Sequence, residues 1–574
     1  MRQRRLLVVL TIVGVLGFAL DASLSAAAGT SGMTRISGSA SPATSNANDP
    51  RVGATAPGSV IDFEVELRPA ASAAAFATAV STPGDPAYGQ FLTASQWEAR
   101  FSPTATQVAE VEAFLHSSGF RIRGVSADRL AVEASGTTAQ VEKAFKTSVA
   151  EYDVAGVTLR LANQDLSLPS GLAGVVAGVS GINQTLTRPA DSGVPSPYAP
   201  PAGFHVAPPC ASSYGQLLDT MLPAYGNGYP SPAPWAVCGY TPPQLRSAYN
   251  LTGADDGAGV TVAIVDAYAS PTLKADAQQY ASMNDPSNPL ADSQFSELLP
   301  SSYDFADLCG ANSWYDEQTL DVEAVHATAP GAHILYVGAE NCAGEMFGAD
   351  RTIVDGHLAN VITNSWLDLG GDVLTDEGTR TMFDNVLMMA AGTGISVLFA
   401  SGDNGDDFTT LGGVVGNYPA TSPWVTAVGG TTLQIDASGQ RSGEAGWSTA
   451  RSFLCNEADM ALGGCTEAQL GQWLPFDLAL DGGSGGGTSF VYPQPSYQAG
   501  VVPTSLSEFN HTGEPMRVYP DVSMVADPAT GMLIGQTQSF PTGVAYNQYR
   551  LGGTSLASPL LAGVIARADE AAGR

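Results

Sequence analysis

The chain has 574 residues, which is long enough for more than one domain and a sizeable hydrophobic core. Its formal net charge of −31 argues against nucleic acid or an anionic membrane as a partner. A surface this acidic loses much of its charge repulsion as pH falls through the carboxylate range, which favours an enzyme that works in acid.

The N-terminal segment has the pattern of a signal peptide. Basic residues within Met1–Arg5 precede an apolar run from Leu6 to Leu20, and Ala26–Ala28 offers small residues for cleavage. The run is too short for a membrane anchor, and no later segment reaches transmembrane length. We therefore expect residues 1–28 to direct secretion to the extracellular space. Residues 29–52 are rich in Ala, Ser, Thr and Gly without an apolar period, which predicts a flexible linker.

Residues 53–187 contain no cysteine and have α/β character. Alternating or helical apolar patterns predict strands and helices at Val60–Leu67, Ala70–Val80, 102–119, Arg121–Val125, Leu130–Glu133, Ala139–Phe145, and a strand pair around Tyr152 and Leu159. This compact domain holds no catalytic constellation of its own. A proline-rich connector over residues 188–209 follows it, which is a natural site for cleavage between domains.

Residues 210–574 alternate buried strands with helices. Continuous apolar runs, separated by helical segments, occur at Val260–Asp266, His333–Val337, Val361–Thr363 and Ser396–Ala400. This pattern predicts a parallel, doubly wound sheet. Active sites of such sheets collect at the carboxyl ends of the strands, where Asp266, Asn364 and Asp403 fall.

All six cysteines lie in this second domain. An even number in an exported protein suggests disulfides, and the simplest of fifteen pairings is Cys210–Cys238, Cys309–Cys342 and Cys455–Cys465. No CxxC spacing or nearby histidine pair indicates a zinc site.

Ser555 lies in the stretch Leu551–Pro559, where two glycines lead into a tight turn and an apolar helix follows. Small residues let other groups approach the turn, and the helix N-terminus offers free N–H groups beside the hydroxyl. This is how a nucleophilic serine is presented. The alternative is a serine that caps an ordinary core helix.

Glu317 and Asp321 are four residues apart on a helix predicted for residues 314–330, so both carboxylates share one face. Like charges at this spacing cost a helix about 0.2–0.5 kcal/mol, so the pair does not serve helix stability. A solvated acidic face is the alternative. The adjoining apolar stripe, which includes Leu320 and Ala324, favours a pair that lies against the core.

Asp403 occupies a glycine-flanked turn directly after a predicted buried strand. Such an aspartate either bonds its own backbone or holds its carboxyl group in a cleft. None of the six histidines lies in a His-Gly-Thr context like that of subtilisins. His326 is nearest in sequence to the acidic pair but falls on a different helical face.

These motifs, in this order, resemble those of the sedolisin family of serine-carboxyl peptidases, which includes kumamolisin-like enzymes and tripeptidyl peptidases. Glu317 to Asp321 resembles the family's Glu-x-x-x-Asp helix, Ala400–Asp403 its Ser-x-Gly-Asp turn, and Gly553–Ser555 its Gly-Thr-Ser turn. Further segments with family character are Tyr240–Tyr249, Tyr418–Thr431, Gly485–Ser489 and Tyr519–Ser523. The first domain resembles the family's activation prodomain, most clearly at Pro86–Thr93.

The resemblance implies a subtilisin-like, doubly wound parallel sheet in the catalytic domain, preceded by a small open-sheet α/β prodomain. It implies that Ser555 is the nucleophile, Glu317 its general base, Asp321 the group that orients Glu317, and Asp403 the oxyanion-hole donor. Asp266 matches a further acid in the network of related enzymes. The implied partners are protein or peptide substrates and the chain's own prodomain, in a monomer.

The implied roles fit acid pH. A carboxylate with a pKa near ~4 stays basic where a histidine with a pKa of ~6.5 is protonated. Asp403 can donate to an oxyanion only when it is protonated, which requires acid pH or a pKa raised by burial.

The family also implies a Ca²⁺ ion, held by a loop well beyond the serine helix. The sequence ends at Arg574, nineteen residues after Ser555, so we expect the calcium ligands to lie outside it and the catalytic domain to be C-terminally incomplete.

The sequence therefore predicts a secreted, acid-active serine endopeptidase with a Ser-Glu-Asp triad, made as a self-processing precursor. The alternatives are a tripeptidyl exopeptidase of the same family, a catalytically inactive secreted binding protein, and a subtilisin-type peptidase active at neutral or alkaline pH.

Overall fold

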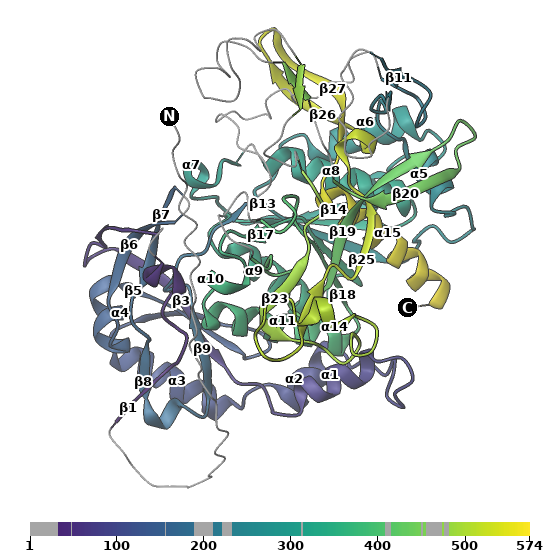
Figure 1. Cartoon of the computed structure of the whole chain (residues 1–574). Coiled ribbons are helices and arrows are strands. Elements are labelled where there is room, and N and C mark those ends of the chain that lie inside the picture. The colour runs from purple at the N-terminus through teal and green to yellow at the C-terminus, as the bar shows by residue number, and fades with distance from the viewer. Residues whose placement is uncertain are drawn as a thin grey trace.

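The computed structural model describes residues 32–46, 49–154, 156–188, 210–220, 232–311, 314–407, 415–448, 452–454, 473–475 and 482–573. The predicted signal peptide, most of the proline-rich connector, and the predicted Cys455–Cys465 pair lie outside these residues. Figure 1 shows a first domain, coloured purple to blue, against a larger second domain, coloured teal to yellow.

The first domain is built on a four-stranded antiparallel sheet of order β4-β5-β3-β9. Its strands are β3 (Val60–Leu67), β4 (Arg121–Val125), β5 (Ala131–Thr137) and β9 (Val176–Ser180). Its helices are α1 (Ala73–Ser81), α2 (Ala94–Phe101), α3 (Ala105–Ser117) and α4 (Thr138–Phe145). The last three helices each begin with a capping box, in which a threonine and a glutamine satisfy free N–H groups of the first turn. Helix α2 is an element that the apolar patterns did not predict.

The flexible linker predicted for residues 29–52 is wrong from Met33 onward, among the residues described. β1 (Met33–Arg35) pairs with β8 (Ser167–Pro169), and β2 (Arg51–Ala54) pairs with β6 (Val149–Val154), which also pairs with β7 (Val157–Ala162). Between them, the buried Ser39 hydroxyl accepts a hydrogen bond from the Leu166 N–H at 2.8 Å. The segment is held by backbone pairing and hydroxyl groups rather than by an apolar stripe, so its pattern resembled that of a linker.

The second domain contains the predicted parallel sheet, in the order β14-β15-β13-β16-β18-β19-β20, with β25 also paired to β19. All of these pairs are parallel except β19–β20. The strands are β13 (Thr261–Ala267), β14 (Phe295–Leu298), β15 (His333–Ala339), β16 (Val361–Asn364), β18 (Ser396–Ala400), β19 (Thr426–Ile435), β20 (Arg441–Gly446) and β25 (Val522–Val525).

Helices cover both faces of this sheet, as the continuous apolar runs required. On β13, Val262 and Ile264 join a core with α6 (Leu273–Asn284), α8 (Trp314–Thr328) and α15 (Thr554–Ala572). Ala263 and Val265 point to the opposite face, where they join a core with α9 (Glu345–Gly356) and α11 (Glu377–Thr393). The two faces of the sheet thus bury two separate hydrophobic cores.

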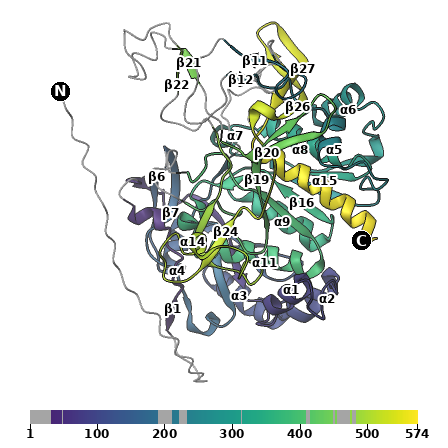
Figure 2. The ribbon, with the colours of Figure 1, turned by 45° about the vertical axis from the view of Figure 1, so that its right-hand side comes forward.

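The first domain packs on the side of the second domain that carries α9 and α11, as both ribbon views show (Figures 1 and 2). The approach is close enough to require glycine: a Cβ on Gly392 of α11 would lie 2.1 Å from the Trp97 ring. On the α9 side, the buried Arg351 bonds the buried Glu66 carboxylate of β3 at 2.5 Å. The two domains therefore pack closely and share a buried ion pair.

Shorter elements complete the described chain. They are β10 (Thr187–Arg188), β11 (Leu218–Asp219), β12 (Ala233–Pro234), α5 (Pro242–Ala248), α7 (Ala306–Cys309), β17 (Leu367–Asp368), α10 (Gly371–Leu374), β21 (Ser452–Leu454), β22 (Trp473–Pro475), β23 (Gly487–Pro493), α14 (Thr504–Ser507), β24 (Met516–Tyr519), β26 (Met532–Phe540) and β27 (Gly543–Leu551). The predicted disulfides Cys210–Cys238 and Cys309–Cys342 are both formed. Within the described ranges, no helix combines the length and apolar character needed to cross a membrane.

Candidate active site

Helix α8 carries Glu317 and Asp321 into the interior of the protein. Every residue from Glu317 to Thr328 is buried, and Asp321 has no exposed surface. The cause is the close packing of α8 on α15, where the Thr328 hydroxyl donates to the Leu560 carbonyl at 3.0 Å and Gly563 leaves room for it. The solvated acidic face that the sequence left open is therefore wrong.

Ser555 lies in the first turn of α15, after Gly553. Gly553 has φ 104° and ψ 159°, a conformation that is essentially confined to glycine. The Ser555 side chain is nearly buried, and its hydroxyl lies close enough to the Glu317 carboxyl group to affect its pKa. Burial raises the pKa of Glu317 and nearby Asp266 raises it further, while the Ser555 hydroxyl lowers it.

Ser365, which follows β16, connects this pair to Asp321. Its buried hydroxyl lies 3.0 Å from Asp321 Oδ1 and 3.3 Å from the backbone carbonyl oxygen of Ser555, so its single proton can be shared by two acceptors. The Ser555 carbonyl is available because Pro559, four residues later, has no N–H to complete the helical bond. Sequence patterns did not single out Ser365, since its role arises from contacts between distant elements.

Asp266 lies at the end of β13, close to both carboxyl groups of α8. It is fully buried, and neither of its carboxyl oxygens has a hydrogen-bond partner among the described residues. Burial raises the pKa of Asp266 to about 8. Burial also raises the pKa of Asp321, with further increases from Asp266 and Glu317. Burial therefore favours the protonated form of each of these three carboxyl groups more than in a free carboxyl group.

Asp403 follows β18 and reaches across to the serine turn. Its Oδ1 accepts hydrogen bonds from the Thr554 N–H and the Thr554 hydroxyl, both at 2.7 Å. The Thr554 hydroxyl in turn accepts from the Gly402 N–H at 3.0 Å. Burial raises the pKa of Asp403, and the two bonds from Thr554 lower it. The carboxyl group is thus bound to the nucleophile turn rather than to its own backbone.

The Oδ2 atom of Asp403 lies beside Gly553. A Cβ added to Gly553 would be 2.6 Å from this oxygen, so only glycine allows the carboxyl group to approach the turn this closely. Both hydrogen bonds from Thr554 reach Oδ1, so Oδ2 takes part in neither of them.

Two other residues that the sequence suggested lie apart from this site. Asn364 is at a strand end as expected, but its amide donates to the Leu398 carbonyl at 3.3 Å and its Oδ1 accepts from the Trp366 indole at 3.0 Å. His326 lies 2.9 Å from the Asn288 carbonyl oxygen. Among the described histidines, none is recorded in contact with Ser555.

Asp276 and Glu323 bind the first strand of the β26–β27 hairpin, whose second strand leads to the serine turn. A Glu323 oxygen accepts from the Gly535 N–H at 2.9 Å, and Asp276 accepts from the Thr537 N–H at 2.8 Å. Both acceptors bind β26, whose partner β27 ends at Leu551 just before the turn. Helix α8 therefore carries Glu317 and Asp321 and also supports the hairpin that positions Ser555.

Two protein families match this chain. Residues 309–573 match the subtilase family, and residues 49–185 match the family described as "Pro-kumamolisin, activation domain". The second domain is thus a subtilase-type serine peptidase, and the first is its activation domain.

Three curated relatives narrow the class. Sedolisin of Pseudomonas sp. (strain 101) is 28% identical over 89% of this chain and 76% of its own length. Kumamolisin of Bacillus sp. (strain MN-32) is 27% identical over 83% of this chain and 77% of its own length. Xanthomonalisin of Xanthomonas sp. (strain T-22) is 27% identical over 89% of this chain but only 58% of its own length. The chain belongs to the sedolisin family, as its motifs predicted.

Calcium binding is common among subtilisin-like peptidases. In the part of the chain that the structure describes, no group of three or more His, Cys, Asp or Glu side chains is placed to hold a metal ion. The described carboxylates therefore do not gather into a calcium site.

Proposed function

We propose that this chain is a secreted, acid-active endopeptidase, made as a precursor that releases its own first domain. The observation that carries the proposal is the placement of the Ser555 hydroxyl, at the start of α15, beside the buried Glu317 carboxyl group of α8. A serine paired with a carboxylate can be activated at a pH where a histidine base would be protonated. The predicted signal peptide at residues 1–28 supports secretion.

In the first half of the reaction, Ser555 Oγ attacks the scissile carbonyl carbon while its proton passes to Glu317. The carbonyl π electrons move to oxygen and form an oxyanion. Glu317 then gives the proton to the leaving amine as the C–N bond breaks, which leaves an acyl ester on Ser555. Water repeats the sequence, with its proton going to Glu317 and then back to Ser555 Oγ as the acid product leaves.

Asp321 and Asp266 tune the base. Burial raises the pKa of Glu317 and Asp266 raises it further by charge repulsion, so Glu317 accepts a proton more readily than a free glutamate. Ser365 fixes one oxygen of Asp321 by donating to it. Asp321 Oδ2 has no hydrogen-bond partner among the described residues, and we assign this carboxyl group the role of orienting Glu317 toward Ser555.

Asp403, in its protonated form, stabilises the oxyanion. Oδ1 already accepts two hydrogen bonds from Thr554, so the proton resides on Oδ2, beside Gly553 and the serine turn. A neutral carboxyl group at this position donates to the oxyanion, a contribution worth about 2.7–4 kcal/mol in other enzymes. Ionisation of Asp403 at higher pH removes that donor, which confines activity to acid.

The end of the first domain supports self-processing. β10 pairs antiparallel with β17, with Thr187 opposite Asp368 and Arg188 opposite Leu367. Its carboxyl end therefore lies two residues along from Ser365, which contacts Ser555. We infer that cleavage occurs within the connector at residues 188–209.

Purified precursor incubated at pH 4 tests the proposal. Wild type should release its first domain and cleave casein, whereas Ser555→Ala should do neither. Ser558→Ala is a matched control, because it removes a buried hydroxyl from the same helix that bonds only the Thr363 hydroxyl. Equal processing by wild type and Ser555→Ala would refute the peptidase mechanism and favour an inactive binding protein.

Peptides with blocked N-termini separate the two peptidase modes. An endopeptidase cleaves an N-acetylated peptide as well as the free one, whereas a tripeptidyl exopeptidase requires the free amine. A rate maximum at neutral or alkaline pH would instead favour a subtilisin-type mechanism.

A further inference from the structure

β10 lies between two segments of the second domain. We call β17 the inner wall and the segment around Cys342 the outer wall. On one side β10 pairs with β17, and the Leu369 N–H donates to the Leu186 carbonyl at 3.0 Å. On the other side, the Thr187 N–H and the Thr187 hydroxyl both donate to the Cys342 carbonyl, each at 2.8 Å. An extended peptide bonded along both edges is held mainly by its backbone, which any peptide sequence can supply.

The inner wall, β17, is held from within the second domain. The Asp368 N–H donates to the Tyr418 carbonyl at 2.8 Å, and the Thr375 hydroxyl donates to the Asp368 carboxylate at 2.5 Å. These bonds connect the inner wall to neighbouring elements on its far side. The wall is therefore rigid without any covalent support.

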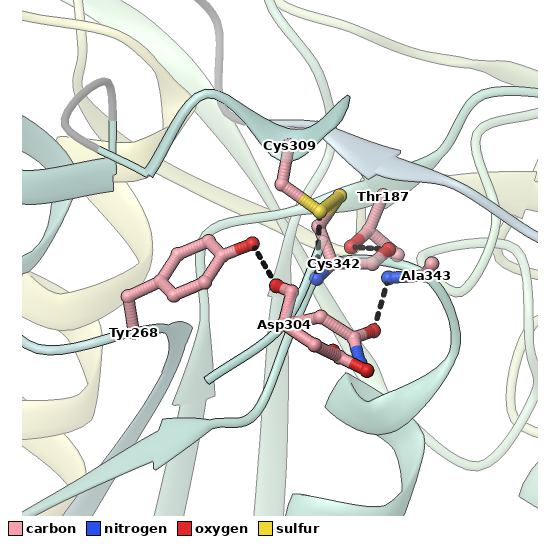
Figure 3. The surroundings of a disulfide bond; sticks show 7 residues. Thr187, Tyr268, Asp304, Cys309, Cys342 and Ala343 are labelled. Atoms are coloured by element: carbon pink, nitrogen blue, oxygen red, sulfur yellow. Dashed lines mark hydrogen bonds between the residues drawn. A yellow bond between two sulfur atoms is a disulfide. The ribbon is translucent and has the colours of Figure 1, made fainter. Parts of the chain in front are cut away.

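The outer wall has a different support. Cys342 follows the end of β15 in a segment that belongs to no strand, and its disulfide to Cys309 joins it to α7 (Figure 3). Around the disulfide, the Asn341 amide donates to Asp304 Oδ1 at 2.6 Å and the Ala343 N–H donates to Asn341 Oδ1 at 2.7 Å. The Tyr268 hydroxyl donates to the Asp304 carbonyl at 2.9 Å. The disulfide is the one covalent connection in this small network.

We propose that the Cys309–Cys342 disulfide positions the outer wall of the peptide-binding groove, so that the Cys342 carbonyl accepts a backbone N–H of an extended peptide substrate. The inference rests on the proposed peptidase activity and adds a specificity element to it. In the precursor, Thr187 occupies this position. After the first domain is released, a substrate residue takes its place.

The register of β10 shows which substrates can contact the outer wall at the Cys342 carbonyl. Thr187 faces Asp368, three residues along from Ser365 at the nucleophile. A peptide in the same register reaches Cys342 only if it extends several residues on the N-terminal side of the scissile bond. Short substrates bind without this contact.

The test compares two cysteine variants with two substrates. In full-length protein activated at pH 4, Cys309→Ser with Cys342→Ser should raise KM for a long peptide by about three- to tenfold, the value of one lost hydrogen bond. KM for a peptide with the same scissile bond but only two preceding residues should not change, and kcat should stay within about twofold for both.

Cys210→Ser with Cys238→Ser is the matched control. The two disulfides span 28 and 33 residues, so their removal should cost similar stability, but Cys210–Cys238 does not touch β10 or β17. This variant should leave the KM ratio of long to short peptide unchanged. The inference is overturned if both double variants change the ratio equally, or if neither does.

N-methylated peptides provide a second test that keeps the wild-type protein. Methylation of each backbone nitrogen in turn should reveal one position, several residues before the scissile bond, where KM rises because the bond to Cys342 is lost. This penalty should vanish in the Cys309/Cys342 variant or, if that variant does not fold, fall in Asn341→Ala. A series in which no such position exists overturns the inference, whereas a wild type that cleaves no peptide at all overturns the proposed function itself.

Discussion

Gly553→Ala should impair both stability and turnover. The backbone at Gly553, with φ 104° and ψ 159°, costs a residue with a Cβ about 1–3 kcal/mol. The new Cβ would also lie 2.6 Å from Asp403 Oδ2, well inside the ~3.5 Å at which heavy atoms attract. Asp403 must then move away from the serine turn. Loss of one oxyanion donor lowers kcat by about 10²–10³-fold in other enzymes, and we expect a loss of this order.

Gly543→Ala separates the effect of backbone strain from the effect of displacing the Asp403 carboxyl group. Gly543 also has a positive φ, 121°, but a Cβ there would meet no atom within 4 Å. Both variants should lower Tm by a few degrees in calorimetry, while only Gly553→Ala should lower kcat on a chromogenic peptide at pH 4. Equal kcat values in the two variants would refute the placement of Asp403 as a donor to the oxyanion.

Three further predictions concern buried polar groups. Burial raises the pKa of Asp266 from 3.8 to about 8, so the contribution of Asp266 to stability is present below pH 3.8 and is lost as pH rises through about 8. Tm measured by calorimetry should therefore fall between these pH values, and it should fall less in Asp266→Asn. Ser365→Ala should lower kcat at least about tenfold and move the acidic limb of the kcat–pH profile to higher pH, because Asp321 loses a bond that lowers its pKa. Ser558→Ala should do neither. Arg351→Met should lower the Tm of the precursor at pH 7 by about 5 °C or more, because a buried carboxylate loses its partner, while Lys274→Met breaks only an exposed pair and should leave Tm within about 1 °C.

Four strands of the eight-stranded sheet, β13, β15, β16 and β18, could be predicted because buried parallel strands leave continuous apolar runs. β18 (Ser396–Ala400) has the predicted bounds, and β13 differs from its prediction by one residue at each end. The chain between Met33 and Ala54 could not be predicted in this way. Its order comes from backbone pairing to distant strands, which leaves no apolar period in the sequence.

The candidate site was predicted only in part. Spacing on a helix placed Glu317 and Asp321 on one face, but spacing alone could not show that α15 would bury that face. Ser365 and Thr554 were not predicted, because a single hydroxyl acquires its role from partners more than forty residues away.

Pro559 in α15 bears on how this protein can be engineered. A proline inside a helix costs about 3 kcal/mol, so a search for thermostable variants would replace it with alanine first. The restored N–H would claim the Ser555 carbonyl and compete with the Ser365 hydroxyl for it. The more stable helix would then lose the hydrogen bond from the Ser365 hydroxyl to the Ser555 carbonyl, which links the Ser555 backbone to Asp321. Stabilising design on this scaffold should therefore leave the first two turns of α15 untouched and look for gains elsewhere.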